Sequence, residues 1–215
     1  MTAKLETFLV HLRPVARDEI VRVLGHSNVC IPTSRVIQSV LGHFGFESYP
    51  VPTEVSACNK VQAKIFNSIG GREQADNVTS EQVKDWASKG AWAAAIGPGV
   101  ERAGVPVRTD GWNGHLVLRV EELLVDGAIE ILNNSPKELI LPKLLWTPVD
   151  PEWDAGTQYA CLTLPNGCDV VYGKLSDGSW RDAPYWKGET EPYKSMQSRM
   201  VEAILTRVNV EQRTP

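Results

Sequence analysis

Residues 111–129 read Gly-Trp-Asn-Gly-His-Leu-Val-Leu-Arg-Val-Glu-Glu-Leu-Leu-Val-Asp-Gly-Ala-Ile, and this stretch decides the fold class. The runs 115–120 and 123–126 are both apolar and both have the composition of a β-strand, with only two glutamates between them. So short a link joins antiparallel neighbours. The stretch therefore predicts a hairpin in which positions 115 and 126 roughly face each other, if the link is centred near Glu121.

Helical patterns precede this hairpin. Apolar residues recur at near-helical spacing from about 5 to 24, where Pro14 is expected to divide the segment into two short helices. Pro32 suits the first turn of the next helix, because its missing N–H would be unpaired there anyway. Cys30 is therefore expected at or just before the start of this helix, whose apolar face carries Val36, Ile37, Val40, Leu41 and Phe44.

The remaining elements complete an α+β order. They are an extended strand over 49–61 with prolines at an edge-like beginning, a helix over 79–95 opened by a capping box, a strand pair 159–164 and 169–175, and a final helix over 191–208. Helices thus dominate the first half and an antiparallel sheet the second, so a helical N-terminal half should pack on the sheet.

Length and composition indicate a single domain. A chain of 215 residues with 42% hydrophobic residues can bury a full core. We expect one domain over 1–215, made of a helical part at about 1–100, a β-sheet part at about 105–180 and a C-terminal helix at about 191–208.

Several classes of function are disfavoured. The net charge of −4 and the absence of a dense Lys/Arg run argue against a nucleic-acid partner. No segment has the roughly 18 apolar residues of a membrane span, and the first residues lack the pattern of a signal peptide, so we expect a cytoplasmic protein that does not bind membranes. The four histidines are scattered and the glycines match no phosphate-binding motif, so neither a metal nor a cofactor is expected.

The cysteines do not form a disulfide framework. Their positions, 30, 58, 161 and 168, include no CxxC pair. If Asn166 and Gly167 form a two-residue turn, Cys168 faces Pro165 and Cys161 faces Tyr172, so the two thiols are not opposite each other. We interpret Cys58, Cys161 and Cys168 as structural.

Three residues form a candidate catalytic set: Cys30 at a helix start, His115 at the start of a strand and Asp126 at the end of the next. Unpaired N–H groups and a partial positive charge at a helix N-terminus favour thiolate over thiol and would receive an oxyanion. A neighbouring histidine pairs with the thiolate and later acts as general acid, while a carboxylate on its far nitrogen fixes the tautomer.

This arrangement resembles the papain-like superfamily in its transglutaminase-like form, where a helix-start Cys, a strand His and an Asp on the following strand succeed one another. The matching stretches are Cys-Ile-Pro-Thr-Ser-Arg-Val-Ile-Gln-Ser-Val-Leu-Gly-His-Phe-Gly-Phe-Glu-Ser-Tyr-Pro-Val (30–51) and the hairpin 111–129. The pattern is also similar to that of arylamine N-acetyltransferases. The resemblance implies a papain-like/transglutaminase-like fold and a Cys30, His115 and Asp126 triad.

The resulting hypothesis is a cysteine-dependent acyl-transfer enzyme, with a peptide, a protein or a small amide or thioester as substrate. Hydrolysis of a peptide or isopeptide bond is favoured, and transglutaminase- or N-acetyltransferase-like transfer to an amine is the alternative. A different class stays open: a non-catalytic protein-binding module that uses its tryptophan-rich C-terminal region. The candidate oxyanion or cleft residues are Asn28, Trp112 and Asn113.

Simpler interpretations exist for each residue. A lone cysteine is usually a small buried apolar group, and His115 by itself could be a strand residue paired with a backbone carbonyl. His26 and His43 compete for the role of base, but His43 lies 13 residues along the helix of Cys30, which is about 20 Å. Trp146, Trp153, Trp180 and Trp186 are either a cleft wall or core anchors.

Overall fold

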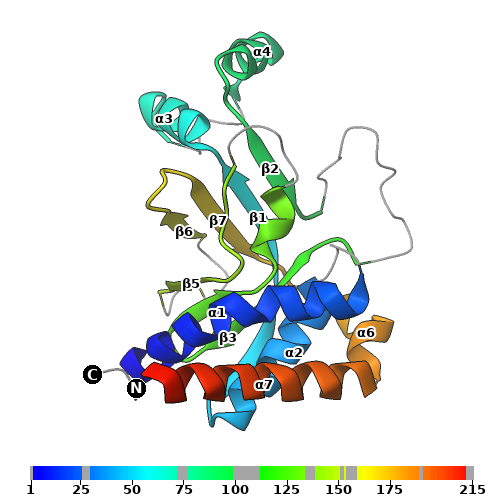
Figure 1. The fold of residues 1–215 in the computed structure, drawn as a ribbon. Helices are drawn as coiled ribbons and strands as arrows, with labels where there is room; N and C mark the ends of the chain where they lie inside the picture. Colours follow the sequence, from blue (N-terminus) through cyan, green and yellow to red (C-terminus); the bar gives the residue numbers. More distant parts are fainter. Residues whose placement is uncertain are drawn as a thin grey trace.

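The computed structural model describes residues 2–25, 30–71, 77–98, 112–133, 139–150, 153, 159–188 and 191–211 (Figure 1). Its helices are α1 (Thr2–Leu24), α2 (Cys30–His43), α3 (Lys60–Ser68), α4 (Ser80–Ser88), α6 (Pro184–Lys187) and α7 (Glu191–Glu211), with 3-10 turns η2 (Ile129–Asn133) and η3 (Ser179–Asp182). Its strands are β1 (Ser48–Cys58), β2 (Ala93–Ile96), β3 (His115–Val120), β4 (Leu123–Asp126), β5 (Leu145–Pro148), β6 (Ala160–Thr163) and β7 (Asp169–Lys174).

The strands form one antiparallel, nearly closed sheet in the order β5-β4-β3-β1-β7-β6. The long strand β1 is at its centre: β3 pairs with residues 48–53, β7 with 53–58, and β2 with 55–58. Pro50 and Pro52 fall in the half of β1 that pairs with β3, just before its pairing with β7 begins at Thr53. This confirms the prediction of prolines at an edge-like beginning of the strand. Proline has no backbone N–H to donate, so it is tolerated where a strand has a neighbour on one side only.

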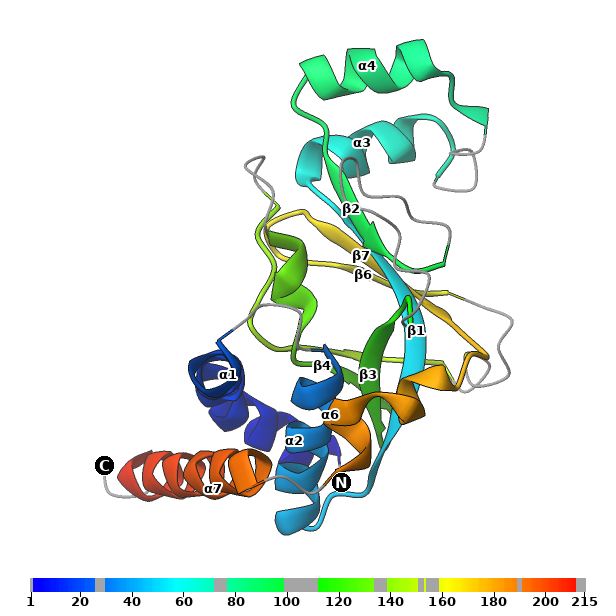
Figure 2. The ribbon, with the colours of Figure 1, turned by 90° about the vertical axis from the view of Figure 1, so that its right-hand side faces the viewer.

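Helices α1, α2 and α7 cover β3 and β4, as Figure 1 and Figure 2 both show. Their buried side chains form one core with the even-numbered residues of β3 and the odd-numbered residues of β4: Leu118, Val120, Leu123 and Val125. A second core contains side chains of β1, β3 and β7, including Val51, Val55, Val117 and Tyr172. The helices and the antiparallel sheet agree with the expected α+β class, although β1 and β2 lie within the predicted helical part.

Two predicted helix boundaries were wrong. Pro14 does not divide the first segment, because α1 runs unbroken from Thr2 to Leu24. Proline disfavours a helix interior, but burial of Leu5, Leu9, Leu12, Ala16 and Ile20 on one side of α1 stabilises the continuous helix. The helix predicted over 79–95 ends at Ser88, since Gly90 adopts a φ of +87°, and Ala93–Ile96 is strand β2.

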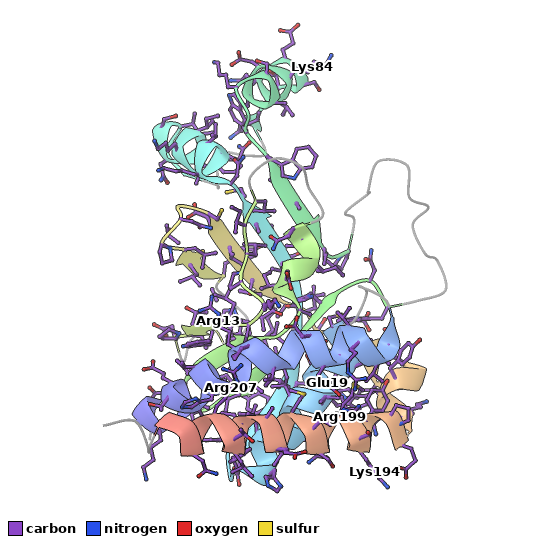
Figure 3. The ribbon with its side chains drawn as sticks, in the orientation of Figure 1. Arg13, Glu19, Lys84, Lys194, Arg199 and Arg207 are labelled. Carbon is purple, nitrogen blue, oxygen red and sulfur yellow. The ribbon has the colours of Figure 1, made fainter. Side chains whose placement is uncertain are left out.

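An ion pair on the surface joins α1 to α7. Glu19 of α1 accepts hydrogen bonds from Arg22 of the same helix and from Arg199 of α7, and Figure 3 shows Glu19 and Arg199 facing each other across the two helices. The hydrogen bond from Arg22, followed by that from Arg199, lowers the pKa of Glu19 despite partial burial. No helix in the described part of the chain is both long and apolar enough to span a bilayer.

Candidate active site

The hairpin of β3 and β4 brings His115 and Asp126 together. Its pairs are Leu118 with Val125 and Val120 with Leu123, so the turn is Glu121 and Glu122, with Glu121 at a φ of +52°. One further step along this register places Asp126 opposite Val117, so the predicted alignment of 115 with 126 was wrong by two residues. Because side chains alternate with a period of two, the face was right. The diagonal neighbours meet, with His115 Nε2 2.7 Å from Asp126 Oδ2.

The carboxylate of Asp126 is held by three hydrogen bonds. Oδ2 accepts from the hydroxyl of Tyr172 at 2.9 Å as well as from His115, and Oδ1 accepts from the backbone N–H of Ala128 at 2.8 Å. The side chains of His115 and Asp126 are 0% and 1% exposed. A buried carboxylate with three donors keeps one orientation and has its charge compensated.

The environment of His115 favours the charged imidazolium. Burial alone would lower its pKa, but the negative charge and hydrogen bond of Asp126, with a smaller contribution from Cys30, raise the pKa to about 10. The ring is therefore cationic at neutral pH.

Cys30 is the first residue of α2 and lies beside this imidazolium. Its side chain is among the groups that raise the pKa of His115, through a hydrogen bond and through charge. Because Asp126 occupies Nε2, Nδ1 is the ring nitrogen left for the thiol. Nδ1 has no partner at ordinary hydrogen-bond geometry among the described residues. The contact with the sulfur is therefore longer or less well aligned than a formed bond, as is common before a substrate binds.

Two buried hydroxyls fix the backbone around His115. Ser34, one turn into α2, donates to the carbonyl of Leu116 at 2.8 Å, which ties the helix to β3. Thr53 of β1 donates to the carbonyl of His115 itself at 2.9 Å. Helix and strand are thus joined within a few residues of both Cys30 and His115.

Gly127 lets α2 approach the end of β4. A Cβ at this position would lie 2.3 Å from Cδ1 of Ile37 and 2.7 Å from Cγ2 of Thr33, both on α2. Glycine at 127 therefore allows the close packing that places the start of α2 near Asp126.

The three candidate oxyanion residues have different outcomes. Asn28 lies outside the described residues, and Asn113 is exposed. Trp112 packs against the apolar cluster of Cys30, Leu116, Ala128 and Trp180, and its Nε1 is buried without a hydrogen-bond partner among the described residues. Its ring folds back over Gly114, where a Cβ would lie 2.5 Å from Cζ2.

The sequence interpretation missed one neighbour of the candidate site, Tyr172, and left a second, Trp180, open between a cleft wall and a core anchor. Tyr172 was expected only as part of a strand, and nothing local indicates that β7 lies beside β1 and so near Asp126. Trp180 is 1% exposed, belongs to the cluster around Cys30, and meets Trp186 edge-on at 4.6 Å between ring centroids. The abundance of tryptophan in the C-terminal part was the one available signal.

The remaining candidates lie elsewhere. His43 ends α2, and Trp153 is buried in the second core, while His26 lies outside the described residues. In the described part of the chain, no group of three or more His, Cys, Asp or Glu side chains could hold a metal ion.

The structure therefore brings together the three residues of the predicted triad. Comparison of the chain with protein families, with curated proteins and with solved structures finds no match.

Proposed function

We propose that this protein is a cysteine-dependent acyl-transfer enzyme of the papain-like/transglutaminase-like type, which hydrolyses peptide, isopeptide or related amide bonds. One observation carries the proposal: His115 is buried between the Asp126 carboxylate on Nε2 and the Cys30 thiol on its other side. This order of groups is that of an activated nucleophile, its acid-base partner and an orienting carboxylate. The packing of α2 on an antiparallel sheet is compatible with such a fold.

The first half-reaction forms an acyl-enzyme. The Cys30 thiolate attacks the substrate carbonyl carbon, a C–S bond forms, and the carbonyl π electrons move to oxygen. When the oxyanion collapses, the C–N bond breaks and the leaving amine takes the proton of the His115 imidazolium. Asp126 keeps the ring oriented throughout.

The second half-reaction releases the acyl group. Neutral His115 now accepts a proton from water, whose oxygen attacks the thioester carbonyl. Collapse breaks the C–S bond, which restores the Cys30 thiolate, the His115 imidazolium and a free carboxylic acid. An amine in place of water would give the transfer reaction, which is the alternative.

The start of α2 and the indole of Trp112 supply candidate donors for the oxyanion. The backbone N–H groups in the first helical turn have no partner within the helix. The Nε1–H of Trp112 is buried in the cluster around Cys30 without a partner among the described residues. A substrate oxyanion would satisfy such a donor.

We expect the intact protein to be acetylated on Cys30 by p-nitrophenyl acetate, an activated ester that needs no specific binding. Mass spectrometry should find one acetyl group on the peptide that contains Cys30, and Cys30→Ala should lower the release of p-nitrophenol by on the order of 100-fold. Added methylamine separates the two outcomes, since N-methylacetamide as main product indicates transfer and acetate indicates hydrolysis. Cys161→Ala, which removes an exposed thiol, is the control. A Cys30→Ala variant as active as the wild type would refute the proposal.

Trp112→Phe should lower kcat for the same ester about tenfold or more while leaving KM nearly unchanged, because an oxyanion donor acts mainly in the transition state. Gly114→Ala should have a similar effect, since the new Cβ displaces the Trp112 ring. Trp153→Phe is the matched control: Trp153 is also a buried tryptophan with an unpartnered Nε1 among the described residues, but it lies in the second core. Equal losses in Trp112→Phe and Trp153→Phe would mean that the effect is structural.

A further inference from the structure

Tyr172 lies on β7, which is separated by β1 and β3 from the strand that carries Asp126. Paired residues on antiparallel strands project from the same face, and β1 pairs Thr53 with His115 on one side and Val55 with Tyr172 on the other. Thr53 and Val55 are two residues apart, so His115 and Tyr172 project from the same face of the sheet. Asp126 completes this face from β4. The strand order β4-β3-β1-β7 therefore places Tyr172 on the same face of the sheet as Asp126, where its hydroxyl contacts the carboxylate.

The hydroxyl of Tyr172 is a neutral donor at this position. Tyr172 is 1% exposed, and its oxygen lies 2.9 Å from Oδ2 of Asp126, the same oxygen that accepts from His115 at 2.7 Å. Burial, and then the negative charge and hydrogen bond of Asp126, raise the pKa of Tyr172 well above its ordinary value. Tyr172 thus keeps its proton and can only donate to the carboxylate.

We propose that Tyr172 is a positioning residue of the Cys30, His115 and Asp126 site, which fixes the carboxylate and weakens its hold on the imidazolium. The inference rests on the proposed function and goes beyond it. His115 must give its proton to the leaving amine, and a carboxylate oxygen bound to His115 alone would retain that proton more strongly. A second donor on Oδ2 takes up part of its charge, which leaves the imidazolium oriented and a better acid.

The test is a ¹⁵N NMR titration of the His115 ring in the full chain, which needs no substrate. Tyr172→Phe removes only the hydroxyl, and we expect it to raise the pH at which His115 loses its proton by about one unit. With p-nitrophenyl acetate, kcat should fall about tenfold at unchanged KM. Tyr193→Phe is the control, because Tyr193 is a largely buried tyrosine in the other core.

A fluorinated tyrosine at position 172 provides a second variant that keeps the ring and the hydrogen bond. Its more acidic hydroxyl is a stronger donor, so the titration of His115 should move in the opposite direction, to lower pH. Opposite shifts in the two variants would support the positioning role. An unchanged titration of His115 in a folded Tyr172→Phe protein, or in the fluorotyrosine protein should Tyr172→Phe fail to fold, would overturn it. Failure of the proposed function would be seen separately, as absence of acetylation on Cys30 in the wild type.

Discussion

Cys30 should react with iodoacetamide almost as fast near pH 6 as near pH 8.5, whereas an ordinary thiol should slow by about 150-fold between the same two values. An ordinary thiol has a pKa of about 8.5 and is roughly half ionised at the upper pH but only about 0.3% ionised at the lower one. Cys30 lies at the start of α2 beside a His115 whose pKa is raised to about 10. An imidazolium that stays charged from pH 6 to pH 8.5 would stabilise the Cys30 thiolate over the same range, so the reactive form would be present throughout.

Comparing each cysteine with itself at two pH values removes the effect of accessibility, which matters because Cys30 is only 8% exposed. His115→Gln should abolish the difference, since glutamine keeps a hydrogen-bond donor for Asp126 but carries no charge. The rate for Cys30 is then expected to fall between pH 8.5 and pH 6 as steeply as that of an ordinary thiol, such as N-acetylcysteine measured in parallel. A wild-type Cys30 that already shows the steep fall would exclude a paired thiolate and with it the proposed mechanism.

The contact of His115 with Asp126 could be predicted from the sequence because it depends on the local pattern of one hairpin. The face shared by His115 and Asp126 follows from the parity of their positions in one hairpin. Position 115 opposite position 126 would centre the turn between Val120 and Glu121, whereas it is centred between Glu121 and Glu122. This error of two residues in the register preserves the parity. The exact register was not needed, because His115 and Asp126 still meet as diagonal neighbours on one face.

The hairpin of β6 and β7 shows how a different error arises. Its turn contains Pro165, Asn166 and Gly167, with Gly167 at a φ of +82°, so Cys161 pairs with Val171 and not with Tyr172 as predicted. The Asn-Gly pair suggested a two-residue turn, but the loop has one residue more. An error of one residue reverses the face of every side chain on a strand.

Tyr172 and Trp180 could not be assigned to the site from the sequence for a different reason. Their contacts depend on which strand lies beside β1 and on where the segment after β7 returns to α2. Both follow from the burial of apolar surface over the whole domain, which no local pattern records. The central position of β1 was unpredicted on the same grounds, although its extended conformation was expected.

The buried pair of His115 and Asp126 should also make the stability of the fold depend on pH. The pKa of His115 is about 6.5 in an unfolded chain and about 10 in the folded protein. Below the lower value the ring is protonated in both states, and the pair contributes its full stabilisation. Between the two values folding requires uptake of a proton by the ring, so the contribution of the pair to the free energy of unfolding should fall as the pH rises, by at most about 1.4 kcal/mol per pH unit.

Chemical denaturation of two proteins between pH 6 and pH 10 measures this contribution: Cys30→Ala with His115 intact, and Cys30→Ala combined with His115→Gln. Removing the thiol from both proteins is necessary because the proposed thiolate of Cys30 depends on His115 and its titration would not cancel. Other groups that titrate in this range are present in both proteins, so their effects largely cancel in the difference between the two free energies of unfolding. The protein with His115 intact should have its greatest advantage near pH 6 and lose most of it by pH 10. A His115 that is neutral in the folded protein would give the opposite sign, because a buried neutral imidazole loses stability on acidification through pH 6.5. The sign of the difference therefore decides which charge state His115 carries beside Asp126.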